Sequence, residues 1–144
     1  MTHRLSAVLA GAALLLSAGQ ALAAASPVGT WYTQDRMAKV RIAPCGQKLC
    51  GSIVWARDRG GKSAAEARDE ANPNPAMRSR PIVGLQIIRD FSPAGPGRWS
   101  GGKIYDPNSG RTYDSKMSLS ANGGLKVEGC VTVICQAQAW TPAD

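Results

Sequence analysis

Histidine is almost absent from this chain, and its one copy, His3, lies in a leader-like segment at the N-terminus. Histidine is the side chain whose ordinary titration falls near neutral pH, and it serves most serine and cysteine hydrolases and most catalytic zinc sites. If the leader is removed, the working protein contains no imidazole. We therefore do not expect an enzyme of those classes.

Long apolar runs are scarce as well. Residues 5–16 form one such run, which follows Arg4 and precedes small residues at Ala21-Leu-Ala23, a pattern typical of a signal peptide. A membrane-spanning helix needs about 20 apolar residues, so this run is too short to span and no later run is longer. We expect residues 1–23 to be a signal peptide, with cleavage as late as residue 25. Residues 24–144 then form a single domain in the periplasm or outside the cell, and not an integral membrane protein.

Phenylalanine occurs once, beside four tryptophans and three tyrosines, so the core must depend on Trp, Ile, Val and Leu. Without Arg4, 16 of the 17 Lys and Arg residues remain against 10 Asp and Glu residues. These charges are scattered and form no basic run. The pattern argues against a nucleic-acid-binding arm, so we expect no nucleic-acid partner, and it favours either a solvated surface or weak attraction to anionic envelope polymers and lipids.

Hydrophobic alternation is typical of β-strands over most of the chain. Turn residues separate the runs at 92–97, 106–110 and 121–124, while residues 57–81 are charged and rich in Pro and Asn. This long loop contains one or two helical turns at 63–70, opened by Ser63 and Glu66. About eight short antiparallel strands indicate a small barrel or sandwich. We favour an all-β barrel, because closure removes exposed strand edges. The expected strands are 28–33, 37–45, 49–56, 82–91, 98–105, 111–119, 125–130 and 133–140.

The four cysteines form two pairs with the same spacing, Cys45 with Cys50 and Cys130 with Cys135. In an oxidising compartment an even count indicates disulfides, with three connectivities open. Residues 46–49 suit a four-residue hairpin loop that places Cys45 opposite Cys50. A continuous strand would hold Cys130 and Cys135 about 16 Å apart, so either the chain turns there or these two cysteines pair elsewhere. We favour two local disulfides because the spacing repeats. We expect no metal and no other cofactor, since these gaps do not suit zinc.

Three carboxylates in the strand-rich half, Asp106, Asp114 and Glu128, leave open a hydrolase that uses a carboxylate pair. Such side chains on alternating strands ordinarily face solvent. Residues 106–110 are better interpreted as a hairpin turn than as a calcium loop, because Met117 stands where the bidentate glutamate should be. We therefore favour a protein that is not an enzyme.

The segment 72–81 is the best candidate for function. Two Asn-Pro steps hold its backbone extended and lead into Arg78 and Arg80. With Asn72, these arginines would present donors at a barrel mouth to a carboxylate or phosphate. The alternative is that they pair with Asp69, Asp106 or backbone carbonyls and fasten the loop over the barrel. Aromatic candidates that either line or fill a cavity are Trp55, Trp99, Tyr105 and Tyr113.

Four groups of residues together resemble a known family: Gly29-Thr-Trp31, Cys45-Gly-Gln-Lys-Leu-Cys-Gly-Ser-Ile-Val-Trp55, Asn72-Pro-Asn-Pro-Ala-Met-Arg-Ser-Arg-Pro81, and Trp99-Ser-Gly-Gly-Lys-Ile-Tyr-Asp-Pro107. The family is the bacterial exported proteins grouped as domain of unknown function 2147. The resemblance implies a small barrel related in shape to lipocalins, whose first strand carries Gly-x-Trp. Lipocalins also place an arginine late in the chain against this tryptophan, and residues 135–140 contain none.

Three functions follow from these patterns. The first is an exported barrel that binds a small amphipathic or anionic ligand. The second is an envelope protein with a filled barrel that binds another protein or polymer. The third is the carboxylate hydrolase. A cavity of a few hundred Å³ favours the first, a filled interior with an exposed apolar patch the second, and two facing carboxyl groups the third.

Overall fold

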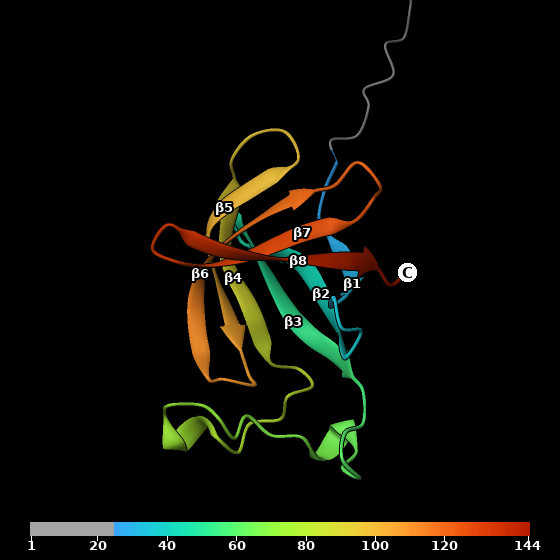
Figure 1. The fold of residues 1–144 in the computed structure, drawn as a ribbon, viewed down its shortest axis with the longest axis vertical. Helices are drawn as coiled ribbons and strands as arrows, with labels where there is room; N and C mark the ends of the chain where they lie inside the picture. Colours follow the sequence, from blue (N-terminus) through green and yellow to red (C-terminus); the bar gives the residue numbers. More distant parts are fainter. Residues whose placement is uncertain (1–24) are drawn as a thin grey trace, which may run out of the picture.

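The chain folds into a closed antiparallel barrel whose strands follow one another in sequence order (Figure 1). The computed structural model describes residues 25–144, so the predicted signal peptide lies outside the described residues. The predicted all-β barrel is confirmed, and each expected strand region holds one strand. The strands are β1 (Gly29–Tyr32), β2 (Ala38–Cys45), β3 (Lys48–Ala56), β4 (Gln86–Pro93), β5 (Arg98–Asp106), β6 (Arg111–Leu119), β7 (Leu125–Val131) and β8 (Ile134–Pro142).

The fourth strand begins later than its sequence predicts. Residues 82–85 form a turn in which the Leu85 N–H donates to the Ile82 carbonyl at 3.1 Å, and Gly84 has a φ of 97°. This left-handed backbone suits glycine and interrupts an otherwise strand-like apolar run. The predicted helical turns at 63–70 shorten to the 3₁₀ helix η1 (Ala64–Glu66), and a second one, η2 (Pro75–Met77), follows. No helix in residues 25–144 is long and apolar enough to cross a membrane.

Inward-facing side chains of the strands form one core. Its most buried members include Val40, Ile42, Ile88, Phe91, Met117 and Trp140. Packing is tight around Phe91, where a Cβ atom built on Gly102 would lie 2.3 Å from the ring. Glycine at this place in β5 therefore leaves room for the ring of the single phenylalanine.

The barrel closes between its first and last strands. Trp31 pairs with Pro142 and Tyr32 with Thr141, so the seam is short. The indole Nε1 of Trp31 donates to the Pro27 carbonyl at 2.8 Å. The barrel therefore closes although residues 135–140 contain no arginine.

Both local disulfides are confirmed, Cys45–Cys50 and Cys130–Cys135. The predicted four-residue loop of the first hairpin is wrong. Gly46, with a φ of 61°, permits a two-residue turn, so Cys45 pairs with Lys48 and Cys50 pairs with Ala43. The two cysteines are thus offset along neighbouring strands, with Cα atoms 5.7 Å apart.

The second disulfide joins residues directly opposite each other in β7 and β8. Cys130 pairs with Cys135, and their Cα atoms lie 4.0 Å apart. The chain turns at residues 132–133 in spite of their strand-forming character, and Thr132 adopts a φ of 54°. The same spacing therefore closes two hairpins in different registers.

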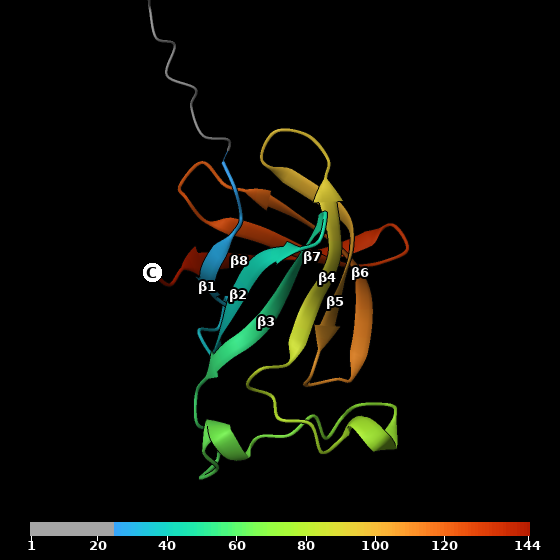
Figure 2. The ribbon, with the colours of Figure 1, turned by 180° about the vertical axis from the view of Figure 1, so that it is seen from behind.

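Residues 57–85, which we call the covering loop, connect β3 to β4. Seen from front and back, this segment runs across one end of the barrel (Figures 1 and 2). The turns β1–β2 and β5–β6 lie toward the same end. The covering loop therefore forms a roof over that end of the barrel.

Candidate functional site

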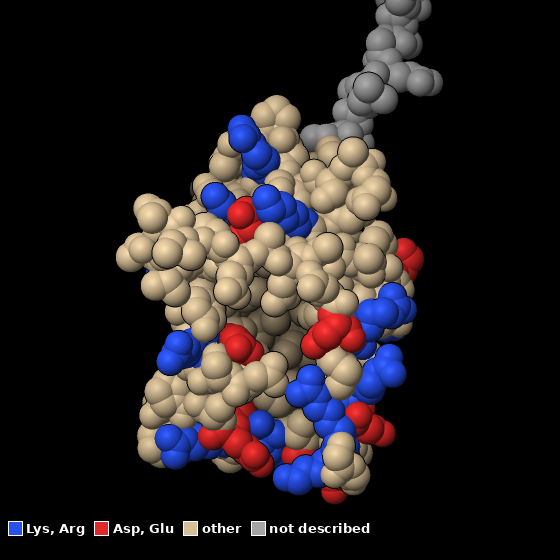
Figure 3. Space-filling view, in the orientation of Figure 1, with Lys and Arg blue, Asp and Glu red and all other residues tan. Residues whose placement is uncertain are grey.

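A cavity of about 1010 Å³ lies between the barrel interior and the covering loop. Figure 3 shows the hollow on the face of the molecule below the β7–β8 hairpin. The apolar part of its wall comes from inward-facing strand residues, namely Ile53, Ile87, Ile104, Val127 and Trp140. This volume is large enough for a small organic ligand. The barrel is therefore hollow at this end.

The mouth of the cavity carries charges of both signs. Among the acidic groups, Asp35 accepts hydrogen bonds from Thr33 and from the Met37 N–H, and Glu66 accepts from Ser63. Burial alone would raise the pKa of Asp35, but these hydrogen bonds outweigh it and lower the pKa. The backbone hydrogen bond from Ser63 likewise lowers the pKa of Glu66. These carboxylates are ionised at neutral pH and bound within their own turns.

The basic groups at the mouth are less constrained. They are Arg57, Arg59, Lys62, Arg68 and Arg111. Arg68 donates to two backbone carbonyls, Arg59 reaches Asn108, and Lys62 lies 4.0 Å from Glu70. Within residues 25–144, the guanidinium groups of Arg57 and Arg111 have neither a hydrogen bond nor an ion pair. Their donors are available to an anionic group in the cavity.

One fully buried carboxylate holds the covering loop against the barrel. Asp69 accepts hydrogen bonds from the Tyr105 hydroxyl at 2.5 Å, from the Asn72 amide at 2.8 Å and from the Arg80 guanidinium at 2.8 Å. Tyr105 belongs to β5, whereas the other three residues belong to the covering loop. Asp69 therefore links the roof of the cavity to its wall.

The titration of this cluster follows from its contacts. Burial by itself raises the pKa of Asp69, but the donors Tyr105, Arg80 and Asn72 together lower the pKa below its usual value. For Tyr105, burial and the neighbouring Asp69 carboxylate both oppose ionisation and raise the pKa to about 12. At neutral pH the cluster is therefore an ionised carboxylate surrounded by protonated donors.

A glycine in the β5–β6 turn allows the covering loop to approach the barrel closely. Gly110 has a φ of 71°, and a Cβ atom built on it would lie 1.9 Å from the Ala71 carbonyl oxygen. The turn itself is stabilised by Asp106, whose carboxylate accepts from the Asn108 N–H and from the Ser109 hydroxyl. Residues 106–110 thus form the predicted hairpin turn, on which the loop rests.

The sequence profile of a family described as "Uncharacterized protein conserved in bacteria (DUF2147)" matches residues 29–142. The chain belongs to the DUF2147 family. Its fold is similar to that of a solved structure titled "Protein HP1028 from the human pathogen Helicobacter pylori belongs to the lipocalin family". The TM-score is 0.72 and the identity 23%, over 83% of this chain and 84% of that one, which shows a shared lipocalin-like fold. No curated protein matches the chain significantly.

The structure of this DUF2147 chain separates the predicted site residues into two groups. Tyr105 and Tyr113 line the cavity. Asn72 and Arg80 bind Asp69 outside the cavity wall, and the Arg78 Nε donates to the Asn72 carbonyl at 2.8 Å. This geometry favours the loop-fastening alternative for both arginines. Their predicted contact with a ligand stays a prediction.

Two predicted aromatic residues lie away from the cavity. Trp99 is buried in the core, whereas Trp55 is 38% exposed on the outer face. A β-bulge explains the second position: Val40 pairs with Ile53 and Lys39 with Trp55, so Val54 is an extra residue and the alternation shifts. On the outer face, the Trp55 ring meets the Tyr32 ring edge-on, with the two ring centroids 6.3 Å apart.

Sequence reasoning missed Arg57 and Arg111 at the mouth. Each stands at a strand end, immediately after β3 and at the start of β6, which is a position where functional side chains often lie. Of the three carboxylates considered for hydrolysis, Asp106 lines the cavity. Asp114 forms an ion pair with Lys103, and Glu128 lies 3.7 Å from Lys126. Of the three, Asp106 alone is among the residues that line the cavity.

Proposed function

We propose that this DUF2147 protein binds a small amphipathic ligand with an anionic group in the cavity beneath the covering loop. The observation that carries the proposal is the combination of an apolar floor with unpaired arginines at the mouth. Ile104 and Trp140 would contact the hydrocarbon part of the ligand, and Arg57 and Arg111 would bind its carboxylate or phosphate.

The arrangement of the covering loop supports this proposal. Asp69 holds the loop in place and Gly110 lets it pack closely on the β5–β6 turn, and neither residue lines the cavity, so the binding site exists before the ligand arrives. A site formed in advance loses less conformational entropy on binding than a site that must be ordered. A signal peptide, with binding in the periplasm or outside the cell, is part of the same proposal, since the two disulfides suit an oxidising compartment.

Titration with the anionic aromatic probe 1-anilinonaphthalene-8-sulfonate, followed by fluorescence, tests the site. Arg57→Gln with Arg111→Gln should weaken binding by about tenfold per arginine, because each loses a charge-assisted hydrogen bond. Ile104→Trp should weaken binding by narrowing the apolar floor. Lys116→Gln, an exposed lysine outside the cavity, is the matched control and should bind like the wild type.

Equal probe affinity in the wild type, in the double arginine variant and in Ile104→Trp would contradict the proposal. Circular dichroism of each variant confirms that the barrel is intact, since the same probe also binds loosened folds. Native mass spectrometry of the protein purified from the periplasm should further show a co-purifying ligand of small mass. The loss of that mass in the double arginine variant would identify its site.

A further inference from the structure

The β7–β8 hairpin ends in a group of exposed aliphatic side chains. Residues 131–134, which we call the apolar tip, include Val131 at 61% exposure, Val133 at 92% and Ile134 at 73%. The hairpin projects from the side of the barrel in both ribbon views (Figures 1 and 2). Aliphatic residues grouped in this way at a projecting turn are typical of a contact surface.

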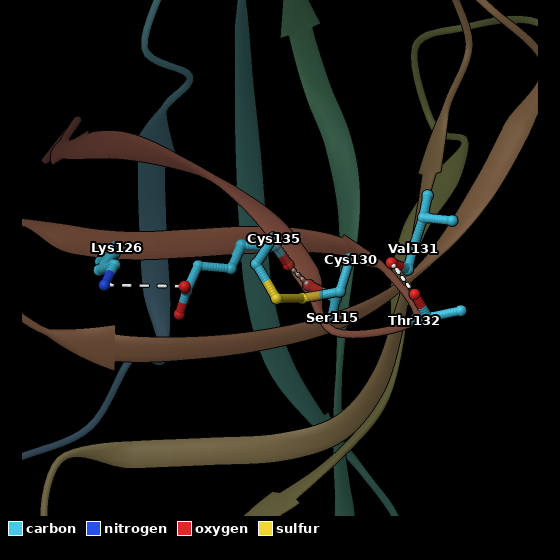
Figure 4. Close-up of a disulfide and its surroundings, with 7 residues drawn as sticks. Ser115, Lys126, Cys130, Val131, Thr132 and Cys135 are labelled. Carbon is cyan, nitrogen blue, oxygen red and sulfur yellow. Dashed lines mark hydrogen bonds and ion pairs between the residues drawn. A yellow bond between two sulfur atoms is a disulfide. The ribbon is translucent and has the colours of Figure 1, made fainter.

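The apolar tip is held by a disulfide and by local hydrogen bonding. The Cys130–Cys135 disulfide closes the hairpin immediately behind it, as the close-up in Figure 4 shows. Val131 pairs with Ile134 across the turn, and the Thr132 hydroxyl donates to the Val131 carbonyl at 2.7 Å. The Thr132 hydroxyl therefore keeps its partner when the tip leaves water, and the disulfide limits the conformational entropy lost on docking.

The size and composition of the apolar tip favour a lipid surface over a protein. Stable protein interfaces bury about 800 Å² on each partner and are enriched in Trp, Tyr and Arg. The tip is a narrow convex turn of four residues without an aromatic side chain. A bilayer accommodates a small apolar projection without a complementary pocket, and insertion is favoured in proportion to the apolar area buried.

Basic groups lie beside the apolar tip. A shallow groove contains Val131 and Thr132 together with Lys103, Arg111 and Asp114. Asp114 pairs with Lys103, whereas Arg111 forms no ion pair within residues 25–144. Basic side chains near a membrane surface are attracted to anionic headgroups. The charges therefore favour an anionic bilayer over a neutral one.

We propose that the apolar tip inserts into the surface of an anionic phospholipid bilayer. Val131 and Ile134 also line the large cavity, so a docked molecule would place the cavity mouth beside the lipid. Transfer of an amphipathic ligand between bilayer and cavity rests on the proposed function above. The docking step itself does not, because the apolar tip and Arg111 are present with or without a ligand.

Flotation of the protein with vesicles tests docking. Wild type should float with vesicles of phosphatidylcholine containing phosphatidylglycerol, and more weakly with phosphatidylcholine alone or at high salt. Val133→Ser with Ile134→Ser should reduce partitioning onto the anionic vesicles by tenfold or more, on the order expected for two aliphatic side chains. Val54→Ser is the matched control, since Val54 is an exposed valine on another strand, and it should float like the wild type.

Each outcome has a distinct meaning. Absence of wild-type flotation with anionic vesicles, or equal loss of flotation in Val54→Ser, would overturn docking. Wild-type dimerisation that the double variant abolishes, without a difference on vesicles, would assign the apolar tip to a second copy of the chain. If the double variant does not fold, Val133→Ser alone gives the comparison. Probe binding in the cavity is measured separately, so flotation without probe binding would refute the proposed function and leave docking intact.

Discussion

Replacing Asp69 with asparagine should detach the covering loop from the barrel. The amide has nearly the same size as the carboxylate, but it is neutral and one of its two terminal groups donates. The variant loses the charge-assisted character of its hydrogen bond with Arg80, of about 1.5–3 kcal/mol, and its amide NH2 must face Tyr105, whose hydroxyl then has to reverse from donor to acceptor. We expect the free energy of unfolding to fall by about 3 kcal/mol.

Thermal unfolding followed by circular dichroism measures this loss. For a domain of this size, about 3 kcal/mol corresponds to a Tm lower by about 10 °C. Asp114→Asn is the matched control, because its partner Lys103 is an exposed lysine and such surface pairs contribute about 0–1 kcal/mol. Tyr105→Phe should be intermediate, and a double-mutant cycle with Asp69→Asn should give non-additive losses. If Asp69→Asn lowers the Tm no more than Asp114→Asn does, the cluster does not fasten the loop.

The pH dependence of stability provides a second test of the same cluster. The pKa of Asp69 is lowered by folding, so its contribution is complete above the ordinary value of 3.8 and is lost as the pH falls through the folded-state pKa. The pKa of Tyr105 is raised from 10.0 to about 12, so its contribution is complete below pH 10 and is lost as the pH rises toward 12. In Tyr105→Phe the alkaline loss should diminish; an unchanged alkaline limb would contradict the assignment.

The remaining predictions concern the supports of the cavity. Gly110→Ala should lower the Tm and increase proteolysis of the covering loop. Gly123→Ala, also at positive φ but in open space, should cost only about 1 kcal/mol of backbone strain. Equal effects of the two substitutions would refute the close packing of the covering loop on Gly110. Arg78→Ala should reduce the free energy of unfolding by about 1 kcal/mol while probe affinity changes little. A large loss of probe affinity with little loss of stability would instead indicate that Arg78 binds the ligand. Cys130→Ser with Cys135→Ser should reduce stability by about 2 kcal/mol, measured by urea unfolding, according to loop entropy.

Alternation of apolar residues was sufficient to predict the strands, because inward and outward positions of a barrel strand differ in solvent exposure. The local disulfides followed from the repeated spacing of the cysteines. The position of Trp55 could not be predicted, since the bulge at Val54 depends on the pairing partner and not on the strand alone. The late start of β4 depended on the turn before it, where Gly84 adopts a left-handed backbone.

The candidate site was less accessible to sequence reasoning. Arg78 and Arg80 make segment 72–81 the predicted functional segment, yet these side chains bind the loop backbone and Asp69. Asp69 lies in a charged stretch typical of a solvated surface, and its burial depends on Tyr105, which is distant in sequence. Such a network exists only after the loop folds back, so local patterns cannot indicate it.

The short seam between β1 and β8 has a consequence for the dynamics of the molecule. Every other pair of neighbouring strands is consecutive in the chain. The barrel is therefore closed by a single contact between strands distant in sequence, β1 with β8. With the register of this contact limited to two residue pairs, amide hydrogens there should exchange with deuterium sooner than those between β6 and β7. The ring would then part at its ends while the remaining strands stay a continuous curved sheet.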